Sequence, residues 1–355
     1  MRLLPTLFHM KQRWEKKKAK VVHAVRQKKR STKFPIYRYY IYTCKIPSMF
    51  TVIERFNGGG EGKETYTLFT EIGHGITSRV YRVHEDPLVV IKVFLSHIDF
   101  GAERRIITRM MPSDTKVYKG TVQSMDSGKY GILMYLCTPI HISLHPGKSR
   151  LLEMQCSRYA RQLLEQLARV HGACIIHNDV KANNILLNNN GEAVLLDYSH
   201  SVVTEPTLFY YGQEKNEDGV ILCGNYIFQS PEVLIMVEQS HKKNNMTRSG
   251  EKLFYTPKSD IFSLGCTLYY WLCDEFPFGN VPSCVKNIPL IMDYIYAGEY
   301  VNSLRFKRLH PITQEFMNLL LQPERVCRPT AKDALTHPFV NCFVPHVKMH
   351  MLLQD

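Results

Sequence analysis

The sequence predicts an α+β fold in which a small β-rich region precedes a larger helical region. Short apolar segments dominate from Tyr66 to Leu136, whereas apolar residues recur at helical spacing from Leu151 onward. The hydrophobic fraction of 45% and the charged fraction of 22% are the balance of a globular protein, which excludes fibrous and wholly disordered classes. The chain contains no apolar run of the roughly 18 residues that a membrane span needs, so we expect no membrane partner.

The residue pattern divides each region into elements. In the first region, alternating and β-branched segments predict strands, with one amphipathic helix between them. These strands are expected at residues 66–72, 79–84, 88–94 and 131–136, and the helix at residues 102–111. In the second region, helical periodicity predicts helices at residues 152–170, 261–273 and 312–321.

Most of the net charge of +13 lies in an N-terminal arm. Residues 1–33 contain twelve lysines and arginines against one acid, Glu15. Such a block is typical of a disordered tail, and its clusters at 16–20 and 26–30 are typical of a nuclear import signal or a nucleic-acid patch. We therefore expect import receptors or nucleic acid as partners of the arm, and a nuclear or cytoplasmic location. A solvated tail without a specific partner is the alternative.

The first candidate site combines a glycine-containing turn with a lysine at a strand. Gly73 and Gly75 lie between two predicted strands, where backbone amides can approach phosphates closely, although a plain β-turn explains the same pattern. Lys92 follows the apolar residues 89–91, where an unpaired ammonium would be costly. Glu103, on the predicted helix that follows, can supply an anionic partner; the alternative is a surface lysine.

The second candidate site is more specific. Asp179, Lys181 and Asn184 lie in one polar loop, and Asp197 ends an apolar segment eighteen residues after Asp179. Carboxylate and amide oxygens are ligands that Mg²⁺ takes beside substrate phosphates. A second carboxylate can accept a hydroxyl proton. A loop with capping residues is the alternative, which the spacing disfavours.

Taken in order, these motifs resemble those of eukaryotic-type protein kinases, from about Phe69 to Phe339. The matching positions are Gly73, Gly75, Val80, Lys92, Glu103, His177, Asp179, Asn184, Asp197, the segment 230–232, Asp260 and Arg328. The resemblance implies a bilobal protein-kinase-like fold, with a kinase domain at 66–340 made of lobes at 66–136 and 137–340. It leaves residues 34–65 as an N-terminal extension or linker and residues 341–355 as a C-terminal tail.

The resemblance also implies roles for the polar residues. Lys92, paired with Glu103, would hold the α- and β-phosphates of ATP. Asp179 would accept the hydroxyl proton of the substrate, and Lys181 would neutralise the transferred phosphoryl group. Asn184 and Asp197 would hold Mg²⁺, which Mn²⁺ could replace.

The remaining implied roles are apolar or structural. Leu133 would guard the back of the nucleotide pocket and residues 134–136 would form its hinge. Glu232 and Arg328 would form a buried ion pair. The full expected pocket consists of Gly73, Gly75, Val80, Val90, Lys92, Leu133, Met134, Leu136 and Leu186.

Four positions depart from the family pattern. Asn178 replaces an arginine that usually reads a phosphate on the activation segment, so we expect activity without that phosphate. Ser199 and Ser78 replace glycines, and Asn225 replaces a threonine. The string Asp197-Tyr198-Ser199 resembles that of some herpesvirus kinases, which suggests an origin in a large DNA virus.

We interpret the chain as a protein kinase that depends on ATP and Mg²⁺ and acts on serine and threonine hydroxyls of protein substrates. Lys181 favours the serine/threonine type, because tyrosine kinases usually have alanine at that position. One alternative is a pseudokinase scaffold that binds nucleotide or partners without efficient transfer. Another is a small-molecule kinase of related fold, which Glu232, Asp260 and Arg328 disfavour.

Overall fold

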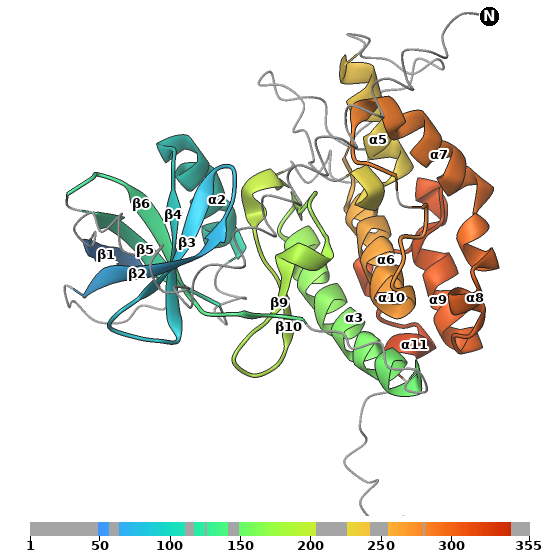
Figure 1. Cartoon of the computed structure of the whole chain (residues 1–355), viewed down its shortest axis with the longest axis horizontal. Coiled ribbons are helices and arrows are strands. Elements are labelled where there is room, and N and C mark those ends of the chain that lie inside the picture. Colours follow the sequence, from blue (N-terminus) through green and yellow to red (C-terminus); the bar gives the residue numbers. More distant parts are fainter. Residues whose placement is uncertain are drawn as a thin grey trace, which may run out of the picture. The chain divides into compact units, whose positions relative to one another are not determined.

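The computed structural model describes residues 49–56, 64–110, 117–124, 126–140, 149–203, 226–241, 255–279 and 281–341. Within this part, Figure 1 shows a group of strands with one helix, followed along the chain by a group of helices. This order confirms the predicted α+β fold class. The basic arm at 1–33, Asn225, most of the segment 34–65 and nearly all of the C-terminal tail lie outside the described residues.

Six antiparallel strands form a closed sheet in the small lobe. The order is β1-β2-β3-β4-β6-β5, and β5 pairs with β1 to close it. The strands are β1 (Met49–Arg55), β2 (Thr65–His74), β3 (Ser78–Val83), β4 (Val89–Phe94), β5 (Tyr118–Ser124) and β6 (Tyr130–Tyr135). All four predicted strands are present. Strands β1 and β5 were not predicted.

Strand β1 lies within residues 34–65, which we expected to form an N-terminal extension or linker. Phe50 pairs with Tyr66 of β2 and with Ser124 of β5, and its side chain is buried. The backbone of residues 49–55 therefore finds its hydrogen-bond partners within the sheet, which an isolated linker could not provide. The sheet of the small lobe therefore includes the residues from Met49 onward.

Helix α2 (His97–Met110) covers part of the sheet and carries one of the predicted site residues. Its buried residues Phe100, Glu103, Ile107 and Met110 recur at helical spacing, which places them on one face. The helix contacts β4 and β6. It begins five residues before the predicted start at 102, because Ser96 accepts the amide of Phe100 and so opens the first turn.

The large lobe is built around two long helices, α3 and α6, that contact each other and bury a shared apolar core. Its helices are α3 (Ser149–Gly172), α5 (Pro231–His241), α6 (Pro257–Cys273), α7 (Ile288–Ala297), α8 (Leu304–Lys307), α9 (Pro311–Leu320), α10 (Ala331–Ala334) and α11 (Pro338–Asn341). The predicted helices at 152–170, 261–273 and 312–321 correspond to α3, α6 and α9.

Short strands at the start of the large lobe fix the polar loops. They are β7 (Thr138–Pro139), β8 (Ile175–Ile176), β9 (Ile185–Leu187), β10 (Ala193–Leu195) and β11 (Val202–Val203). Strand β9 pairs with β10 and β7, and β8 pairs with β11. These pairings hold the segments before and after residues 177–184 and 196–201 in register.

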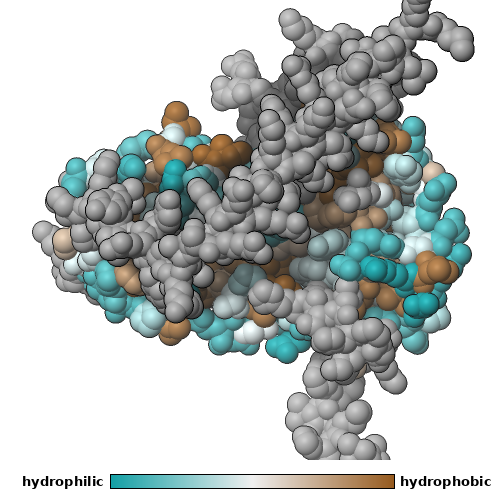
Figure 2. Space-filling model, in the orientation of Figure 1, coloured by the Kyte–Doolittle hydropathy of each residue, from teal (hydrophilic) through white to brown (hydrophobic). Residues whose placement is uncertain are grey.

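Figure 2 shows hydrophilic side chains over much of the described surface, with apolar areas between them. None of the described helices combines the length and the apolar composition that crossing a bilayer requires.

Helix α6 approaches the end of α9 closely at Gly265. A Cβ atom there would lie 2.9 Å from Leu321 Cδ2 and 3.0 Å from Leu320 Cβ. We expect Gly265→Ala to lower the free energy of unfolding by about 1–3 kcal/mol, because the packed core must shift. Gly101→Ala in α2 is the matched control, since a Cβ there meets nothing within 4 Å. That change should raise stability by about 0.5–1 kcal/mol. Chemical denaturation of both variants measures the difference, and equal effects would contradict the packing argument.

Candidate active site

Lys92 joins three segments of the chain through its ammonium group. The side chain is buried on β4, where an uncompensated charge would be costly. Its Nζ donates to Glu103 Oε1 at 2.8 Å and Oε2 at 2.7 Å on α2, and to Asp197 Oδ1 at 2.8 Å. Burial favours the neutral amine, but the two carboxylates outweigh it and raise the pKa of Lys92. The lysine is therefore a fixed cation.

Asp179 is held in one orientation by two neighbours in the same loop. Lys181 Nζ donates to Asp179 Oδ1 at 2.9 Å and to Oδ2 at 2.7 Å. Asn184 Nδ2 donates to the Asp179 backbone carbonyl at 2.8 Å and to Oδ2 at 2.7 Å. Only 3% of the Asp179 residue surface is exposed. The loop thus gathers the three polar residues that the sequence analysis selected from it.

Asp260, in the first turn of α6, accepts hydrogen bonds from the backbone of this loop. Its Oδ2 accepts the amide of His177 at 2.8 Å and its Oδ1 accepts the amide of Asn178 at 2.9 Å. His171 Nε2 lies 2.9 Å from the same Oδ2. A buried carboxylate with several hydrogen bonds stabilises a loop that would otherwise leave amides unpaired. The residues next to Asp179 are therefore fixed by the large lobe.

A single backbone hydrogen bond brings Asp197 beside the loop. The amide of Leu196 donates to the carbonyl of Asn184 at 2.8 Å, next to the β9–β10 pairing. Asp197 then takes a left-handed backbone conformation, with φ of 67°. Its carboxylate contacts Lys92 and accepts a hydrogen bond from Ser199.

The ionisation of Asp197 is set by its neighbours. Burial opposes ionisation, but the Lys92 ammonium and the hydrogen bonds from Lys92 and Ser199 hold the pKa of Asp197 well below its usual range. About 39% of this side chain is exposed, so the carboxylate is both charged and accessible. Such a group can hold a cation.

Tyr198 packs beneath this segment and is almost fully buried. Its ring lies 4.8 Å from the ring of His177 and 6.5 Å from that of Tyr118. Gln166 of α3 donates to Tyr198 Oη at 3.1 Å and exchanges hydrogen bonds with the backbone of Leu195 at 2.8 Å. The amide of Gln166 therefore satisfies a hydroxyl that would otherwise be costly to bury.

The glycine-containing turn lies between β2 and β3. Gly73 pairs with Val80, and a Cβ on Gly73 would lie 3.3 Å from Val80 Cβ. The amide of Gly75 donates to the carbonyl of Ser78 at 2.9 Å, which closes the turn. Ile76 at its tip is 97% exposed. The backbone is therefore closely packed at Gly73 and Gly75, whereas Ile76 is exposed to solvent.

A second ion pair lies deeper in the large lobe. Arg328 donates to Glu232 Oε1 at 2.8 Å and to Oε2 at 2.5 Å, and both residues are buried. Ser259 donates to Glu232 Oε1 at 2.9 Å, and the Arg328 guanidinium lies 5.2 Å from the ring centre of Phe262. The structure thus contains the buried ion pair that the resemblance implied.

Residues 66–340 match the protein kinase domain family. The chain belongs to this family. Mouse sperm motility kinase 3A is 27% identical over 282 residues, which cover 78% of this chain and 49% of that protein. The hormonally up-regulated neu tumor-associated kinase homolog of Xenopus tropicalis is 27% identical over 214 residues, or 60% of this chain and 27% of its own length.

A plant relative is similar at about the same level. CBL-interacting serine/threonine-protein kinase 13 of Arabidopsis thaliana is 24% identical over 312 residues, which cover 81% of this chain and 53% of that protein. The chain spans about half the length of the mouse relative and of the plant relative. A protein kinase domain generally uses ATP and Mg²⁺.

The residues of this kinase domain fit a magnesium ion. Asn184 uses both hydrogens of its amide on Asp179, which leaves its Oδ1 as an acceptor. Asp197 adds an ionised, accessible carboxylate. Among the described residues, no group of three or more histidine, cysteine, aspartate or glutamate side chains could form a metal site. Two oxygen ligands are nevertheless what Mg²⁺ takes when phosphates supply others.

The sheet register bears on one pocket residue of the kinase domain. Met134 pairs with Val90, whereas Leu133 pairs with Ile91. Directly paired residues share a face and neighbours alternate, so Met134 lies on the face of Val90 and Lys92. Leu133 instead packs in the apolar cluster of the opposite face, with Ile91. The register therefore favours Met134 over Leu133 as the residue beside Lys92, where we expected Leu133 to guard the back of the pocket.

The other apolar residues expected around the nucleotide belong to one cluster. Val90 and Met134 are buried in it, and Val80, Leu136 and Leu186 pack against it. These five residues come from β3, β4, β6, the segment after β6, and β9. The structure therefore brings together side chains from both lobes of the kinase domain.

Three polar residues of the site were not predicted from the sequence. Gln166 and His171 lie on the buried side of α3, where an unexpected polar residue among leucines was the available signal. His200 Nδ1 lies 3.7 Å from Asp179 Oδ2. No spacing in the sequence distinguished His200 from an ordinary loop histidine.

Proposed function

We propose that this kinase domain transfers the γ-phosphoryl group of ATP to serine and threonine hydroxyls of protein substrates. The observation that carries the proposal is the convergence of Lys92, Asp179, Asn184 and Asp197 through hydrogen bonds and backbone pairing. The plant relative is named a serine/threonine-protein kinase, which supports the substrate class. Lys181 beside Asp179 supports it as well.

Each residue would contribute positioning or charge, which are the main requirements of phosphoryl transfer. Lys92, fixed by Glu103, would bind the α- and β-phosphates. Asn184 and Asp197 would hold Mg²⁺, which when bound would neutralise phosphate charge. The oxygen of the substrate hydroxyl would bond to the γ-phosphorus while the bond from that phosphorus to ADP breaks. Asp179 would accept the hydroxyl proton. Lys181 would then offset charge on the transferred group.

The nucleotide base would lie among apolar side chains. Val80, Val90 and Leu186 would contact its faces, and Met134 would close the back of the pocket in place of Leu133. Gly73 and Gly75 would bring backbone amides close to the phosphates, with Leu136 at the hinge. An apolar enclosure with few polar contacts is usual for small-ligand sites.

The direct test is incubation of the whole chain with labelled ATP, magnesium and an array of serine, threonine and tyrosine peptides. We expect label on serine and threonine peptides, and none when magnesium is chelated. A phosphatase-treated sample should remain active, because Asn178 is uncharged and its Nδ2 donates to the His200 carbonyl at 3.4 Å. Nucleotide binding without transfer would instead support the pseudokinase scaffold.

The remaining predictions rest on the sequence. We propose that residues 1–33 form a basic arm and that the N-terminal extension, expected at 34–65, ends before Met49. The kinase domain would then end near residue 340 and be followed by a C-terminal tail at 341–355. Binding of import receptors or nucleic acid by the arm, a nuclear or cytoplasmic location, and a viral origin stay predictions. A salt titration of nucleic-acid binding with and without residues 1–33 tests the arm.

A further inference from the structure

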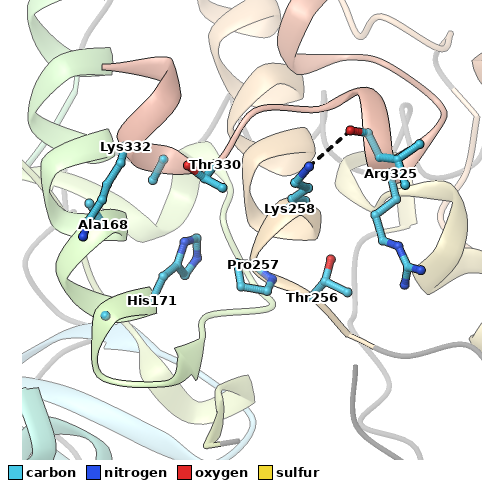
Figure 3. A pocket seen from close by; sticks show the side chains of 11 residues that line it. Ala168, His171, Thr256, Pro257, Lys258, Arg325, Thr330 and Lys332 are labelled. Atoms are coloured by element: carbon cyan, nitrogen blue, oxygen red, sulfur yellow. Dashed lines mark hydrogen bonds between the residues drawn. The ribbon is translucent and has the colours of Figure 1, made fainter. Parts of the chain in front are cut away.

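A cavity of about 270 Å³ lies in the large lobe. None of the residues proposed to contact ATP, Mg²⁺ or the substrate lines it, whereas His171, which contacts Asp260, does. It is partly open to solvent and is lined by the end of α3, the first turn of α6 and the segment 325–332, which Figure 3 shows around it. The lining residues are Ala168, His171, Gly172, Thr256, Pro257, Lys258, Arg325, Val326, Thr330, Ala331 and Lys332.

The charged residues that line this cavity are all basic. Lys258, Arg325 and Lys332 line it, and no aspartate or glutamate does. In Figure 3, Lys332 lies on one side and Lys258 and Arg325 on the other, with His171 and Pro257 between them. Lys258 Nζ donates to the carbonyl of Val326 at 3.3 Å, a neutral acceptor. Within the described part of the chain, none of the three cations forms an ion pair.

Two acidic residues of the adjoining segments, Asp260 and Asp333, have hydrogen-bond partners of their own. Asp260 accepts hydrogen bonds from the amides of His177 and Asn178 and contacts His171. Asp333 completes the capping box of α10 by accepting the amide of Thr330 at 3.1 Å and its Oγ1 at 2.7 Å. These hydrogen bonds and the charge of Lys258 lower the pKa of Asp333.

The cations remain accessible to a ligand. Lys258 and Arg325 are half-buried and Lys332 is exposed. Lys258 also lies in the first turn of the 17-residue helix α6, at the positive end of its dipole, where an anion is favourable. An anionic ligand would offset this like charge.

We propose that this cavity binds the side chain of a phosphorylated serine or threonine within a protein segment. A phosphoryl group carries a charge of about −1.5 to −2, which is opposite in sign to the cations that line the cavity. The volume lies below the roughly 300–1,000 Å³ of pockets for drug-sized ligands, so it suits one side chain better than a nucleotide. The apolar surfaces of Ala168, Pro257 and Ala331 can contact its methylene or methyl group.

The shape and charge of the cavity also limit other occupants. The basic arm at 1–33 is excluded by like charge. A hollow that admits one side chain does not offer the extended surface that a membrane or a nucleic-acid duplex contacts. A phosphorylated protein segment is thus the ligand class that fits both the charge and the volume.

The test measures binding by the whole chain, with the active site blocked by magnesium and a non-hydrolysable ATP analogue. The probes are inorganic phosphate and a capped alanine pentapeptide with a central phosphoserine or, for comparison, serine. We expect the phosphopeptide to bind about tenfold more tightly than either of the other probes. Because no transfer is measured, a failure of this binding is distinct from a failure of the proposed kinase activity.

The double variant Lys258→Gln/Arg325→Gln should weaken phosphopeptide binding by about tenfold or more. The matched control, Lys286→Gln/Lys307→Gln, removes two exposed cations that do not line the cavity, and its affinity should stay within about twofold. His171 is left unchanged because it contacts Asp260. Equal weakening in both double variants, or equal affinity for the serine and phosphoserine peptides, would overturn the proposal.

A second measurement uses the unaltered chain. Lysine acetylation, read by mass spectrometry, should slow at Lys258 and Lys332 when the phosphopeptide is present, while Lys286 and Lys307 react as before. Lack of protection at Lys258 and Lys332 contradicts the proposal. Protection by a short oligodeoxythymidylate but not by the phosphopeptide would overturn it in favour of nucleic acid.

Discussion

Replacing Asp197 with alanine should lower the rate of phosphoryl transfer on the order of a thousandfold or more. The change removes the ionised carboxylate that would hold Mg²⁺ and one of the two anions that fix Lys92. Loss of one preorganised electrostatic group typically costs about 10²–10³ in rate, and loss of a metal ligand adds to this. Initial rates of labelled phosphate transfer to a serine peptide measure the effect.

The fold should survive this change. Lys92 keeps its two hydrogen bonds to Glu103, so no buried charge is left without a partner. Asp293→Ala, which removes an exposed carboxylate from α7, is the matched control and should leave the rate within about twofold. Undiminished transfer by the Asp197 variant, with a normal unfolding midpoint, would exclude the proposed metal site.

Lys92→Met is a less clean test of the same site. It would also abolish transfer, but it leaves Glu103 buried without its cation. Breaking a buried pair typically lowers stability by about 3–5 kcal/mol. A loss of activity in this variant is therefore informative only beside its unfolding curve.

A large loss of stability is also expected from Glu232→Ala. The change leaves the Arg328 guanidinium fully buried, with only the carbonyls of Lys258 and Pro323 as remaining partners. Removal of one partner of a buried ion pair costs about 3–5 kcal/mol, because the other charge stays uncompensated. Urea denaturation at neutral pH measures the difference in free energy of unfolding from the unaltered protein.

An exposed ion pair provides the control for this prediction. Arg161 Nε lies 3.0 Å from Glu165 Oε1 on α3, and both side chains are more than 40% exposed. Glu165→Ala should change stability by less than about 0.5 kcal/mol, because solvent screens such pairs. If both glutamate variants lost the same stability, burial of the Glu232 pair would not be the cause.

The Glu232 effect should also depend on pH. Burial opposes ionisation of Glu232, but the hydrogen bonds and charge of Arg328 lower its pKa from the ordinary 4.5. A carboxyl group with a lowered folded pKa contributes its full stability above the unfolded pKa and loses it as the pH falls through the folded value. The gap between the unaltered protein and Glu232→Ala should therefore be constant above about pH 5 and shrink below 4.5.

The sequence predicted the polar centre better than its apolar surroundings. Lys92, Asp179, Asn184 and Asp197 could be selected because charged groups beside apolar segments need partners, and few arrangements supply them. Leu133 and Met134 could not be distinguished in this way, since both are apolar and buried. A shift of one residue along a strand moves a side chain to the other face, and only the pairing with β4 decides which one faces Lys92.

Strands β1 and β5 were missed for a related reason. Gly120 interrupts the apolar pattern of β5, and its absent side chain is required because a Cβ there would lie 2.1 Å from the Glu54 carbonyl oxygen. What makes β5 a strand here is its pairing with β1, where Arg55 lies opposite Gly120, 65 residues away along the chain, rather than its own residues. Pairing between distant segments therefore overrides local propensity here.

The link between Gln166 and Tyr198 has a consequence for inhibitor design. Compounds that bind only after the ring of Tyr198 leaves its buried place would have to break the hydrogen bond from Gln166 and leave that amide short of an acceptor. A phenylalanine at this position could leave the buried place without breaking a hydrogen bond, because it has no hydroxyl. Compounds that bind with the Tyr198 ring in its buried place are accordingly the better starting points for ligands of this chain.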